Sequence, residues 1–423
     1  MMQDLTTNAN NGIHSLPTNQ DIPFSILDND LYKFTMQQFV FIHFRDIPVK
    51  YRFKNRSPTI RLNEPAIEWL KSRIQGLEKL SLTADERQFL EGYSFFSREY
   101  LEFLQSFRYR PAEQVNISLD SDGDLQLNIQ GFWHEVILYE VPLLALVSEA
   151  YFRFVDLDWN YDGQESRAKA KAMKLLQHGC VFSEFGTRRR RDYYTQDIVV
   201  RVLARANKEH LLENPGSQGK LVGTSNVHFA HKYGLTAVGT LAHELFMGVS
   251  ALEGVANANR LTLEKWHDTY KGQLGIALTD TFGTEVFFRD FGGKLANAFS
   301  GVRHDSGDPF GFVDRVVEHY RTLGINASQK VIMFSDSLTP ELAIQLKEHC
   351  DSSGVKCAFG IGTNFTNDFE RKGGGKSVPM NIVIKLSECR GIPVVKLSDE
   401  KTKHSGPKEA VQDALRILGL PLD

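Results

Sequence analysis

Cysteine, net charge and long apolar runs are all scarce in this 423-residue chain, and each shortage excludes a class of protein. The four cysteines (Cys180, Cys350, Cys357 and Cys389) form no CxxC pair and no cluster with metal-ligand spacing, so we expect free thiols in a reducing compartment. The formal net charge of -3 gives no global basic field for nucleic acid or a membrane surface. No apolar run reaches the roughly 18 residues of a membrane span, so we expect no membrane partner.

The rest of the composition is that of a globular protein, with 42% hydrophobic and 24% charged residues. The length allows two or three domains of about 100–200 residues each. The first 20 residues are polar and lack the apolar segment of a secretory signal, so we predict a disordered tail over residues 1–20. These features favour a cytoplasmic protein, with a nuclear pool in addition if the source is fungal.

The pattern up to about residue 145 is α+β. A helix dense in Leu, Phe and Val is predicted from about Asn29 to Phe44, and a strand at Val49–Arg56. Strong helix formers fill residues 60–110. The runs VNISL and LQLNIQG flank SDGD, which predicts a hairpin with Asp-Gly in its turn.

From about residue 175, short β-rich runs recur, each ending in small or polar residues: CVFSEFGTR, KLVGTSN, TAVGTLAHE, LGIALTDT, GVRHDSGD, KVIMFSDS and CAFGIGT. Helical segments fill several of the gaps, as in GFVDRVVEHYRTLG and TPELAIQLKEHC. Alternating strands and helices predict parallel βαβ units. Seven strands approach the eight of a (β/α) barrel, and an open doubly wound sheet is the alternative.

The last 45 residues or so have a different pattern. NIVIKLSECRGIPVVKLS contains two strands around an Arg-Gly turn, which indicates an antiparallel hairpin, and KEAVQDALRILG predicts a final helix. Since such a hairpin does not suit a parallel barrel, we expect this segment to return to the first domain. The predicted division is therefore residues 21–145 plus 376–423 as one domain and 146–375 as the other.

Ligands in parallel α/β folds bind at the carboxyl ends of the strands, so the ends of the seven runs are the place to seek chemistry. In FGIGTN, Gly360 and Gly362 permit close backbone approach and Thr363 adds a hydroxyl, which suits a phosphate held by backbone N–H groups. An ordinary βα turn is the plainer interpretation. The related string RKGGGKSVP lacks the first glycine of a Walker A loop, so we interpret it as a flexible linker.

GVRHDSGD places Asp305 and Asp308 in a tight turn after a strand, where carboxylates can bind ribose hydroxyls directly or through Mg²⁺. Arg303 lies two residues before Asp305, so both point to the same side of an extended strand. The alternative is a capped turn with a salt bridge.

EFGTRRRRDY carries four consecutive arginines, residues 188–191, whose planar guanidinium groups suit pyrophosphate. A solvated face, a localisation signal or a nucleic-acid patch are the alternatives. His243 follows a strand end in GTLAHE, where it can act as a base, a ligand or a nucleophile, or serve the structure alone. HExxH is absent, which excludes a zincin.

In their joint order, these runs resemble the nicotinate phosphoribosyltransferase family over nearly the whole chain after the tail. The strings that carry the resemblance are DNDLYKFTM, FSEFGTRRR, GTSN, GTLAHE, IALTDT, RHDSGDP, FSDSL, FGIGTN and NIVIKLSECRGIPVVKLSD. The resemblance implies a type II phosphoribosyltransferase fold, in which an N-terminal α/β sandwich domain adjoins an irregular, incomplete (β/α) barrel.

The resemblance also implies a reaction. Nicotinate and 5-phosphoribosyl-1-pyrophosphate would give nicotinate mononucleotide and pyrophosphate, coupled to ATP hydrolysis through a phosphohistidine at His243, in the Preiss-Handler route of NAD salvage. ATP is thus a co-substrate and Mg²⁺ the implied cofactor, entering with substrate and held in part by Asp305. Such enzymes are typically homodimers with shared active sites.

Each site residue takes an expected role from the resemblance and its own chemistry. His243, Asp280 and Asp305 would be catalytic, since carboxylates favour the positive charge that develops on ribose. Nicotinate would be bound by Tyr32, Thr240, Arg303 and Ser225, with Arg303 pairing its carboxylate. Phosphoribosyl pyrophosphate would be bound by Arg188, Arg189, Asp308, Gly362 and Thr363.

Two details separate this reaction from its alternatives. Relatives that use nicotinamide carry an aspartate in the stretch matching GTSN, whereas Ser225 here favours the acid. Quinolinate-using relatives lack the ATP-linked histidine segment. A nucleic-acid-binding protein is disfavoured by the acidic balance, and a barrel aldolase by the absence of lysine from the strand ends.

Overall fold

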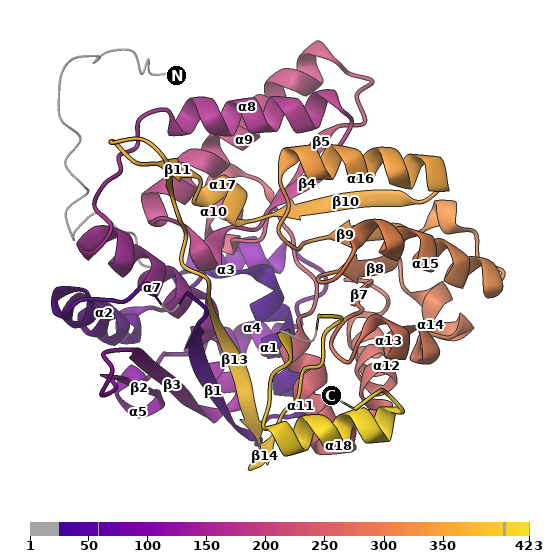
Figure 1. The fold of residues 1–423 in the computed structure, drawn as a ribbon, viewed down its shortest axis with the longest axis horizontal. Coiled ribbons are helices and arrows are strands. Elements are labelled where there is room, and N and C mark those ends of the chain that lie inside the picture. Colours follow the sequence, from indigo (N-terminus) through magenta and orange to yellow (C-terminus); the bar gives the residue numbers. More distant parts are fainter. Residues whose placement is uncertain (1–24, 58, 401–402, 423) are drawn as a thin grey trace.

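A computed structural model describes residues 25–57, 59–400 and 403–422, so the predicted tail over residues 1–20 lies outside the described part. Two large sheets organise the fold (Figure 1): one antiparallel with five strands and one parallel with seven. None of the helices in the described part is both long and apolar enough to cross a bilayer.

The antiparallel sheet has the strand order β14-β13-β1-β3-β2. Its strands are β1 (Pro48–Asn55), β2 (Val115–Leu119), β3 (Leu125–Phe132), β13 (Ile382–Cys389) and β14 (Ile392–Pro393). The predicted hairpins are both present, since β2 pairs with β3 and β13 with β14. β13 also pairs with β1 from the far end of the chain, so the C-terminal segment completes this sheet (Figure 1).

The segment that supplies β1, β2 and β3 also forms the helices α1 (Leu31–His43), α2 (Glu64–Gly76), α3 (Ala84–Glu91), α4 (Arg98–Ser106), α5 (Pro111–Gln114), α6 (Trp133–Val136) and α7 (Glu140–Phe154). Side-chain caps fix where several begin, because a capping oxygen satisfies an N–H that the helix cannot. Asn63 caps α2, Ser97 caps α4, and Thr83 forms a capping box with Glu86 at α3.

All seven predicted β-rich runs form strands of one parallel sheet, ordered β6-β5-β4-β10-β9-β8-β7. They are β4 (Val181–Glu184), β5 (Lys220–Thr224), β6 (Thr236–Ala237), β7 (Ile276–Leu278), β8 (Gly301–His304), β9 (Val331–Phe334) and β10 (Lys356–Ile361). The sheet curls into a half-barrel and leaves β6 and β7 as its unpaired edges. The predicted incomplete barrel is thereby confirmed, and the doubly wound alternative was wrong.

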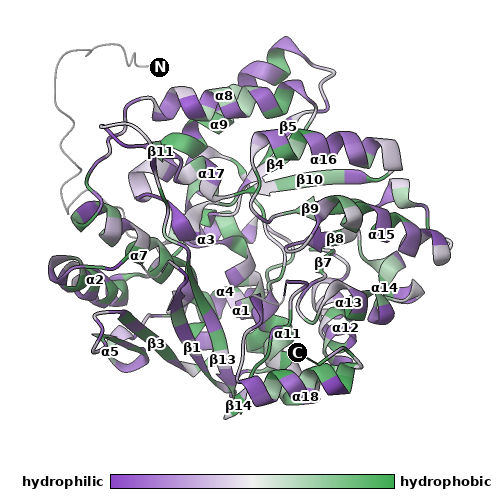
Figure 2. Cartoon of the chain, in the orientation of Figure 1, coloured by the Kyte–Doolittle hydropathy of each residue, from purple (hydrophilic) through white to green (hydrophobic). Residues whose placement is uncertain are grey.

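The helices that follow α7 are α8 (Gln164–Gln177), α9 (Tyr193–Glu213), α10 (Val227–Tyr233), α11 (His243–Glu253), α12 (Ala258–Tyr270), α13 (Thr284–Asp290), α14 (Gly293–Ala298), α15 (Pro309–Thr322), α16 (Pro340–Ser353), α17 (Thr363–Thr366) and α18 (Lys408–Leu418). Hydrophilic and hydrophobic residues alternate around the outer helices and along the antiparallel strands β1 and β13 (Figure 2). α15 shows the reason, because Phe312, Val316 and Tyr320 lie on one buried stripe.

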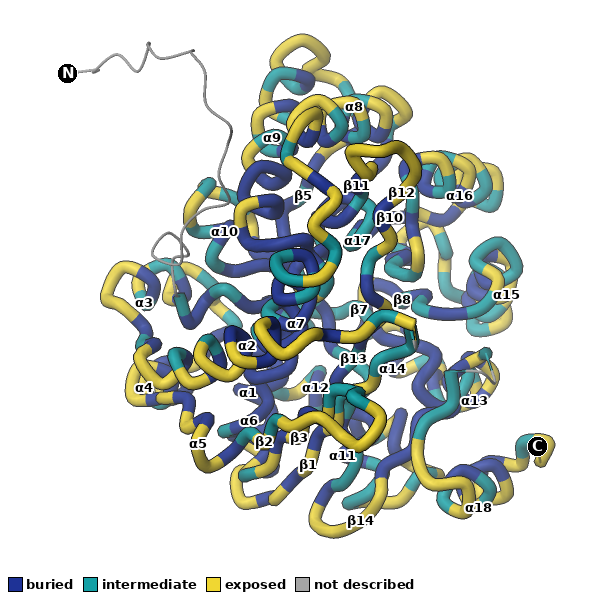
Figure 3. Tube along the Cα trace, turned by 60° about the vertical axis from the view of Figure 1, so that its left-hand side comes forward, coloured by how far each residue is buried: buried dark blue, intermediate teal, exposed yellow. Residues whose placement is uncertain are grey.

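Buried residues fill the interior along α1, α7 and the parallel strand β8, while the outer turns of α2, α8 and α16 are exposed (Figure 3). One continuous apolar cluster joins both sheets, with Trp133 and Trp266 among its largest members. α18 contacts the short turn Val255–Asn257, and Arg289 donates to the carbonyl of Leu418, so the last helix lies against the α11–α12 region.

The interpretation of RKGGGKSVP as a flexible linker was wrong. The segment forms a small antiparallel ribbon of β11 (Phe369–Glu370) and β12 (Lys376–Ser377). The Arg371 N–H donates to the Gly375 carbonyl and closes the turn, in which Gly374 and Gly375 adopt positive φ. The glycines therefore serve a tight turn.

Candidate active site

Four of the predicted catalytic and binding residues meet at the carboxyl edge of the half-barrel. His243 is the first residue of α11 and follows β6, Asp280 follows β7, Arg303 lies in β8 and Asp305 follows β8. Parallel strands bring their carboxyl ends to one edge, so residues distant in sequence converge there. The sequence prediction that these four belong to one site agrees with this placement.

The imidazole of His243 lies between two carboxylates. Its Nε2 is 2.8 Å from Asp280 Oδ1 and 3.6 Å from Asp305 Oδ2. The three side chains form a group whose ligand atoms all lie within 4.8 Å of one another. Asp280 is almost fully buried, whereas His243 and Asp305 have side chains 17% and 24% exposed. The arrangement is therefore open to a substrate on one side only.

Burial and charge set the protonation states of this group. Burial lowers the pKa of His243, and the nearby Lys396 ammonium lowers it further, so the neutral imidazole is favoured. Burial opposes ionisation of Asp280, yet the Lys396 ammonium and the hydrogen bonds from His243 and Ser306 hold its pKa well below its ordinary range. A neutral imidazole beside a fixed carboxylate is a competent nucleophile or base.

Arg303 is held at the same edge with part of its guanidinium unused. Its Nη1 donates to Thr240 Oγ1 at 2.5 Å and to the Leu241 carbonyl at 3.1 Å, and its Nη2 lies 3.6 Å from Asp305 Oδ1. Its Nε is buried and has no partner among the described residues. A buried N–H without an acceptor is costly, so this group fits a ligand oxygen.

Tyr32 and Arg188 form a second part of the site, beside the first. The backbone of Tyr32 lies against Gly239, where an added Cβ would approach the Tyr32 nitrogen to 2.9 Å. The side chains of Tyr32, Glu140, Asp30 and Asp305 raise the pKa of the half-exposed Arg188 guanidinium. Arg188 is thus a permanent cation, and its Nη1 lies 3.6 Å from Glu140 Oε1.

The four consecutive arginines do not act as one surface. Arg189 donates through Nε to the Ile382 carbonyl, and Arg190 makes two hydrogen bonds to the Asp28 carboxylate. Arg191 is fully buried, 3.6 Å from the Phe152 ring centre and 4.1 Å from that of Phe369. Two of the four are therefore core residues, and the alternative of a solvated basic face or nucleic-acid patch was wrong.

Ser225 donates to Asp30 Oδ1 at 2.8 Å and is buried. Glu184, also buried, accepts from Gly186, Gln196 and Thr224, all neutral donors. Burial accordingly raises the pKa of Glu184 to about 7. Ser225 thus belongs to a packed polar layer that supports Tyr32 and Arg188.

The remaining predicted residues have visible structural tasks. Asp308 caps α15 and accepts from the Phe310 and Gly311 amides at 3.1 Å each, which matches the capped-turn alternative. A Cβ on Gly362 would come within 2.8 Å of the Phe185 carbonyl, so close packing requires glycine there. Thr363 begins the short helix α17 directly after it. Their expected role in binding phosphate stays a prediction.

Sequence reasoning missed Lys396, Ser306 and Ser398, all of which contact Asp280 Oδ2. Lys396 Nζ lies 3.2 Å from it, Ser306 Oγ 2.7 Å and Ser398 Oγ 3.3 Å. Ser306 stood inside the RHDSGD string and could have been chosen as a hydroxyl beside two carboxylates. No local signal pointed to Lys396 or Ser398, which arrive from the C-terminal segment.

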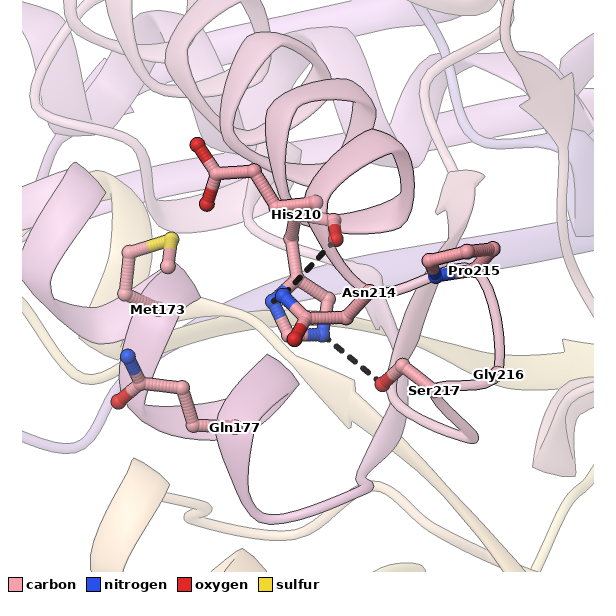
Figure 4. A pocket seen from close by; sticks show the side chains of 8 residues that line it. Met173, Gln177, His210, Asn214, Pro215, Gly216 and Ser217 are labelled. Atoms are coloured by element: carbon pink, nitrogen blue, oxygen red, sulfur yellow. Dashed lines mark hydrogen bonds between the residues drawn. The ribbon is translucent and has the colours of Figure 1, made fainter.

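A separate hollow of about 520 Å³ lies between the ends of α8 and α9, lined by Met173, Gln177, His210 and the loop 213–217 (Figure 4). His210 Nε2 lies 2.8 Å from Ser217 Oγ, and the Asn214 amide contacts its other nitrogen at 3.5 Å. Both ring nitrogens of His210 thus contact residues of the adjacent loop. None of the predicted site residues lines this hollow, so the candidate site remains the carboxyl edge.

Comparison with known proteins identifies the family of the chain. The model of the nicotinate phosphoribosyltransferase (NAPRTase) family matches residues 180–418, and that of the NAPRTase N-terminal domain matches residues 27–148. A nicotinate phosphoribosyltransferase of Methanosarcina acetivorans is 46% identical over 412 residues, covering 93% of this chain and 98% of its own. The crystal structure of nicotinate phosphoribosyltransferase from Porphyromonas gingivalis superposes with a TM-score of 0.85 at 38% identity, covering 94% and 100%. That from Vibrio cholerae gives 0.86 at 33%, covering 96% of each.

Proposed function

Since the chain belongs to the nicotinate phosphoribosyltransferase family, we propose that it transfers the phosphoribosyl group of 5-phosphoribosyl-1-pyrophosphate to the ring nitrogen of nicotinate. The products are nicotinate mononucleotide and pyrophosphate, which places the reaction in NAD biosynthesis. The observation that carries the proposal is Arg303, with its buried, unpartnered Nε beside Thr240. Arginine pairs a carboxylate with two parallel hydrogen bonds, and nicotinate offers one.

The carboxylates beside Arg303 suit the sugar chemistry. The bond from the anomeric carbon to pyrophosphate breaks, pyrophosphate leaves with the electron pair, and the nicotinate nitrogen forms the new bond. Positive charge develops on the ribose, and fixed carboxylates in a water-poor site stabilise it without reorganising. Asp305 is the partly exposed carboxylate of the group, so it is the one we assign to the ribose.

Mg²⁺ fits this donor set in one way. Asp280 is committed to His243, Ser306 and Lys396, whereas the Asp305 side chain is 24% exposed. Mg²⁺ prefers one or two carboxylates together with water and phosphate oxygens, so Asp305 is the residue that would hold it. When bound, the ion would neutralise charge on the departing pyrophosphate.

We further propose that His243 accepts the γ-phosphoryl group of ATP. Its Nε2 is engaged by Asp280, so the lone pair available for attack is on Nδ1. The N–P bond forms as the bond from phosphorus to the ADP oxygen breaks, and ADP leaves with that electron pair. Burial and Lys396 favour the neutral, nucleophilic ring. The phosphate then adds negative charge near Arg188 and Arg303, which would tighten binding of the Mg²⁺-bound sugar pyrophosphate.

A homodimer with shared sites is proposed as well. Large apolar side chains are exposed on the antiparallel sheet, with Phe132 44% and Ile392 46% accessible. Light scattering of the full chain tests this, and a monomer at all concentrations would contradict it.

The deciding experiment is product analysis with nicotinate, phosphoribosyl pyrophosphate and ATP, omitting each in turn. Omission of nicotinate or the sugar should abolish nicotinate mononucleotide, and omission of ATP should reduce it. His243→Asn should keep the fold, lose acid-labile label from γ-phosphate-labelled ATP, and retain some ATP-independent synthesis. His349→Asn removes a surface histidine that pairs with Asp314 and is the matched control. Label persisting on His243→Asn would disprove the phosphohistidine, and synthesis with nicotinamide alone would disprove the substrate.

A further inference from the structure

Residues 394–400, here named the strap, cross from β14 to the carboxyl edge of the half-barrel. The Leu397 N–H donates to the Thr281 carbonyl at 2.9 Å, Asp399 accepts from the Thr284 N–H at 2.7 Å, and Glu400 accepts from the Gly307 N–H at 3.2 Å. These partners follow β7 and β8, the strands that also carry Asp280 and Asp305. The strap is thus fastened on both sides of one residue, Ser398.

Ser398 is buried and has a left-handed backbone conformation, with φ of 60°. Non-glycine residues adopt this conformation at a cost, and glycine would adopt it freely. A strained residue that keeps its side chain directs attention to what the side chain does. Here the Oγ of Ser398 lies 3.3 Å from Asp280 Oδ2 and 3.0 Å from Ser306 Oγ.

A single hydroxyl proton serves both of these contacts. Ser306 donates its own proton to Asp280 Oδ2 at 2.7 Å, so its oxygen is free to accept from Ser398. The Ser398 proton therefore strengthens hydrogen bonding at Oδ2, either directly or through Ser306. With Lys396 Nζ at 3.2 Å, Oδ2 has three donors around it.

This arrangement divides the Asp280 carboxylate into two halves with different tasks. Three donors fix Oδ2, so the carboxylate cannot rotate freely, and Oδ1 stays 2.8 Å from His243 Nε2. An acceptor at that position keeps the ring proton on Nε2 and the lone pair on Nδ1, because a histidine's tautomer follows the hydrogen bond of its other nitrogen.

We propose that Ser398 is a positioning residue that fixes Asp280 so that His243 presents Nδ1, and not Nε2, to the phosphoryl donor. The inference rests on the proposed phosphorylation of His243 and names the part of the chain that directs it. Ser398 itself touches no reacting atom. Its effect reaches the ring through Ser306 and Asp280.

The test compares Ser398→Ala and Ser398→Gly with Ser405→Ala, measured on the full chain with γ-phosphate-labelled ATP. Ser405 is a neighbouring serine whose buried Oγ has no hydrogen-bond partner among the described residues, so it is a matched control. The initial rate of labelling and its KM for ATP are measured, and ³¹P NMR of the alkali-denatured protein identifies the phosphohistidine isomer.

We expect Ser398→Ala to label about tenfold more slowly, the usual loss for one hydrogen bond to a charged group, with KM for ATP unchanged. A fraction of the label should move to the Nε2 isomer, which a general loss of stability would not produce. Ser398→Gly should show the same rate and isomers while unfolding at no lower temperature than the wild type, because glycine relieves the strained backbone. Ser405→Ala should match the wild type.

Three outcomes overturn the inference. Ser398→Ala that labels at the wild-type rate and only on Nδ1 shows that the hydroxyl does not position Asp280. Equal losses in Ser398→Ala and Ser405→Ala assign the effect to the strap as a whole. A wild-type chain that takes no label at His243 removes the proposed phosphorylation together with this inference, whereas the first two outcomes leave that phosphorylation intact.

Discussion

His243 and Glu244 are neighbours in the chain, but their side chains enter two clusters of opposite character. The site cluster consists of His243, Asp280, Arg303 and Asp305. The buried cluster consists of Glu244, Lys33, Glu140, Tyr51 and Trp133. Lys33 is fully buried and contacts both glutamates, 2.5 Å from Glu140 Oε2, while Glu244 Oε1 accepts from Tyr51 at 2.5 Å and Trp133 at 3.0 Å.

The difference lies in what is left unpaired. In the buried cluster every charge meets an opposite charge or a hydrogen-bond donor, so the cluster is complete without a ligand. In the site cluster the Arg303 Nε lacks a partner among the described residues, and Asp305 is open to solvent on one side. Density of charge therefore does not identify a site, whereas an unpaired donor beside a partly exposed carboxylate marks one here.

Lys33→Met should give the largest effect and separate the clusters most clearly. It leaves the buried Glu244 without a cation among the described residues and Glu140 with Arg188 alone, 3.6 Å away, so we expect a loss of about 4 kcal/mol in the free energy of unfolding. Chemical denaturation measures this. Lys50→Met removes an exposed partner of Glu388 and should change stability by less than about 0.5 kcal/mol. Equal effects of both substitutions would contradict the distinction.

Asp305→Asn should lower the rate of synthesis and leave the stability of the fold unchanged. Loss of one charge contact in a closed site costs on the order of 3 kcal/mol, about a hundredfold in the rate of synthesis. Steady-state kinetics and a thermal melt on the same sample check both halves of the prediction. Asp314→Asn, at the surface, is the control. Near wild-type turnover of Asp305→Asn would refute its assignment to the ribose.

Glu184→Gln tests a buried carboxylate that has only neutral donors around it. Burial raises its pKa to about 7 from an ordinary 4.5, so the folded chain holds a proton that the unfolded chain has released between these pH values. The wild type should therefore lose stability as the pH rises from 5 to 8, whereas the variant should lose on the order of 2 kcal/mol less. Parallel pH profiles of unfolding would show that Glu184 ionises normally.

Ser225→Asp should give the smallest of these effects. The new carboxylate would lie beside Asp30, whose Oδ1 now accepts from Ser225, and near the proposed nicotinate carboxylate. Repulsion in a low-dielectric site should lower kcat/KM for nicotinate about tenfold. Ser225→Ala, which removes the hydroxyl without adding charge, should cost less. Unchanged nicotinate kinetics in Ser225→Asp would mean that selectivity lies elsewhere.

Much of the site cluster could be predicted from the sequence because its members follow parallel strands. His243, Asp280 and Asp305 each stand just after a β-rich run, and one topological rule places such residues at one edge. The strands themselves were recognisable because each run ends abruptly in small or polar residues.

The rest depended on contacts that no local pattern records. Lys396 and Ser398 reach Asp280 from the segment that follows β14 of the antiparallel sheet. The periodicity of a sequence does not predict which part of the second sheet such a segment will contact. The separate positions of the four arginines could not be predicted for another reason. Arg188 and Arg191 stand three residues apart across a turn, Thr187–Arg189, and only the surrounding packing decides that one faces the site and the other the core.

The open half-barrel has a mechanical consequence. Its two edge strands are β6 and β7, and His243 follows the first while Asp280 follows the second. Side chains bridge the gap between these edges: His243 Nε2 bonds to Asp280 Oδ1, and Arg303 Nη1 donates to Thr240 Oγ1 and to the Leu241 carbonyl. Widening the gap between β6 and β7 breaks no backbone hydrogen bond of the sheet. We therefore expect the half-barrel to deform more easily there than between two paired strands. A chemical change at His243 alters one of these bridging hydrogen bonds, so we expect it to change the separation of β6 and β7.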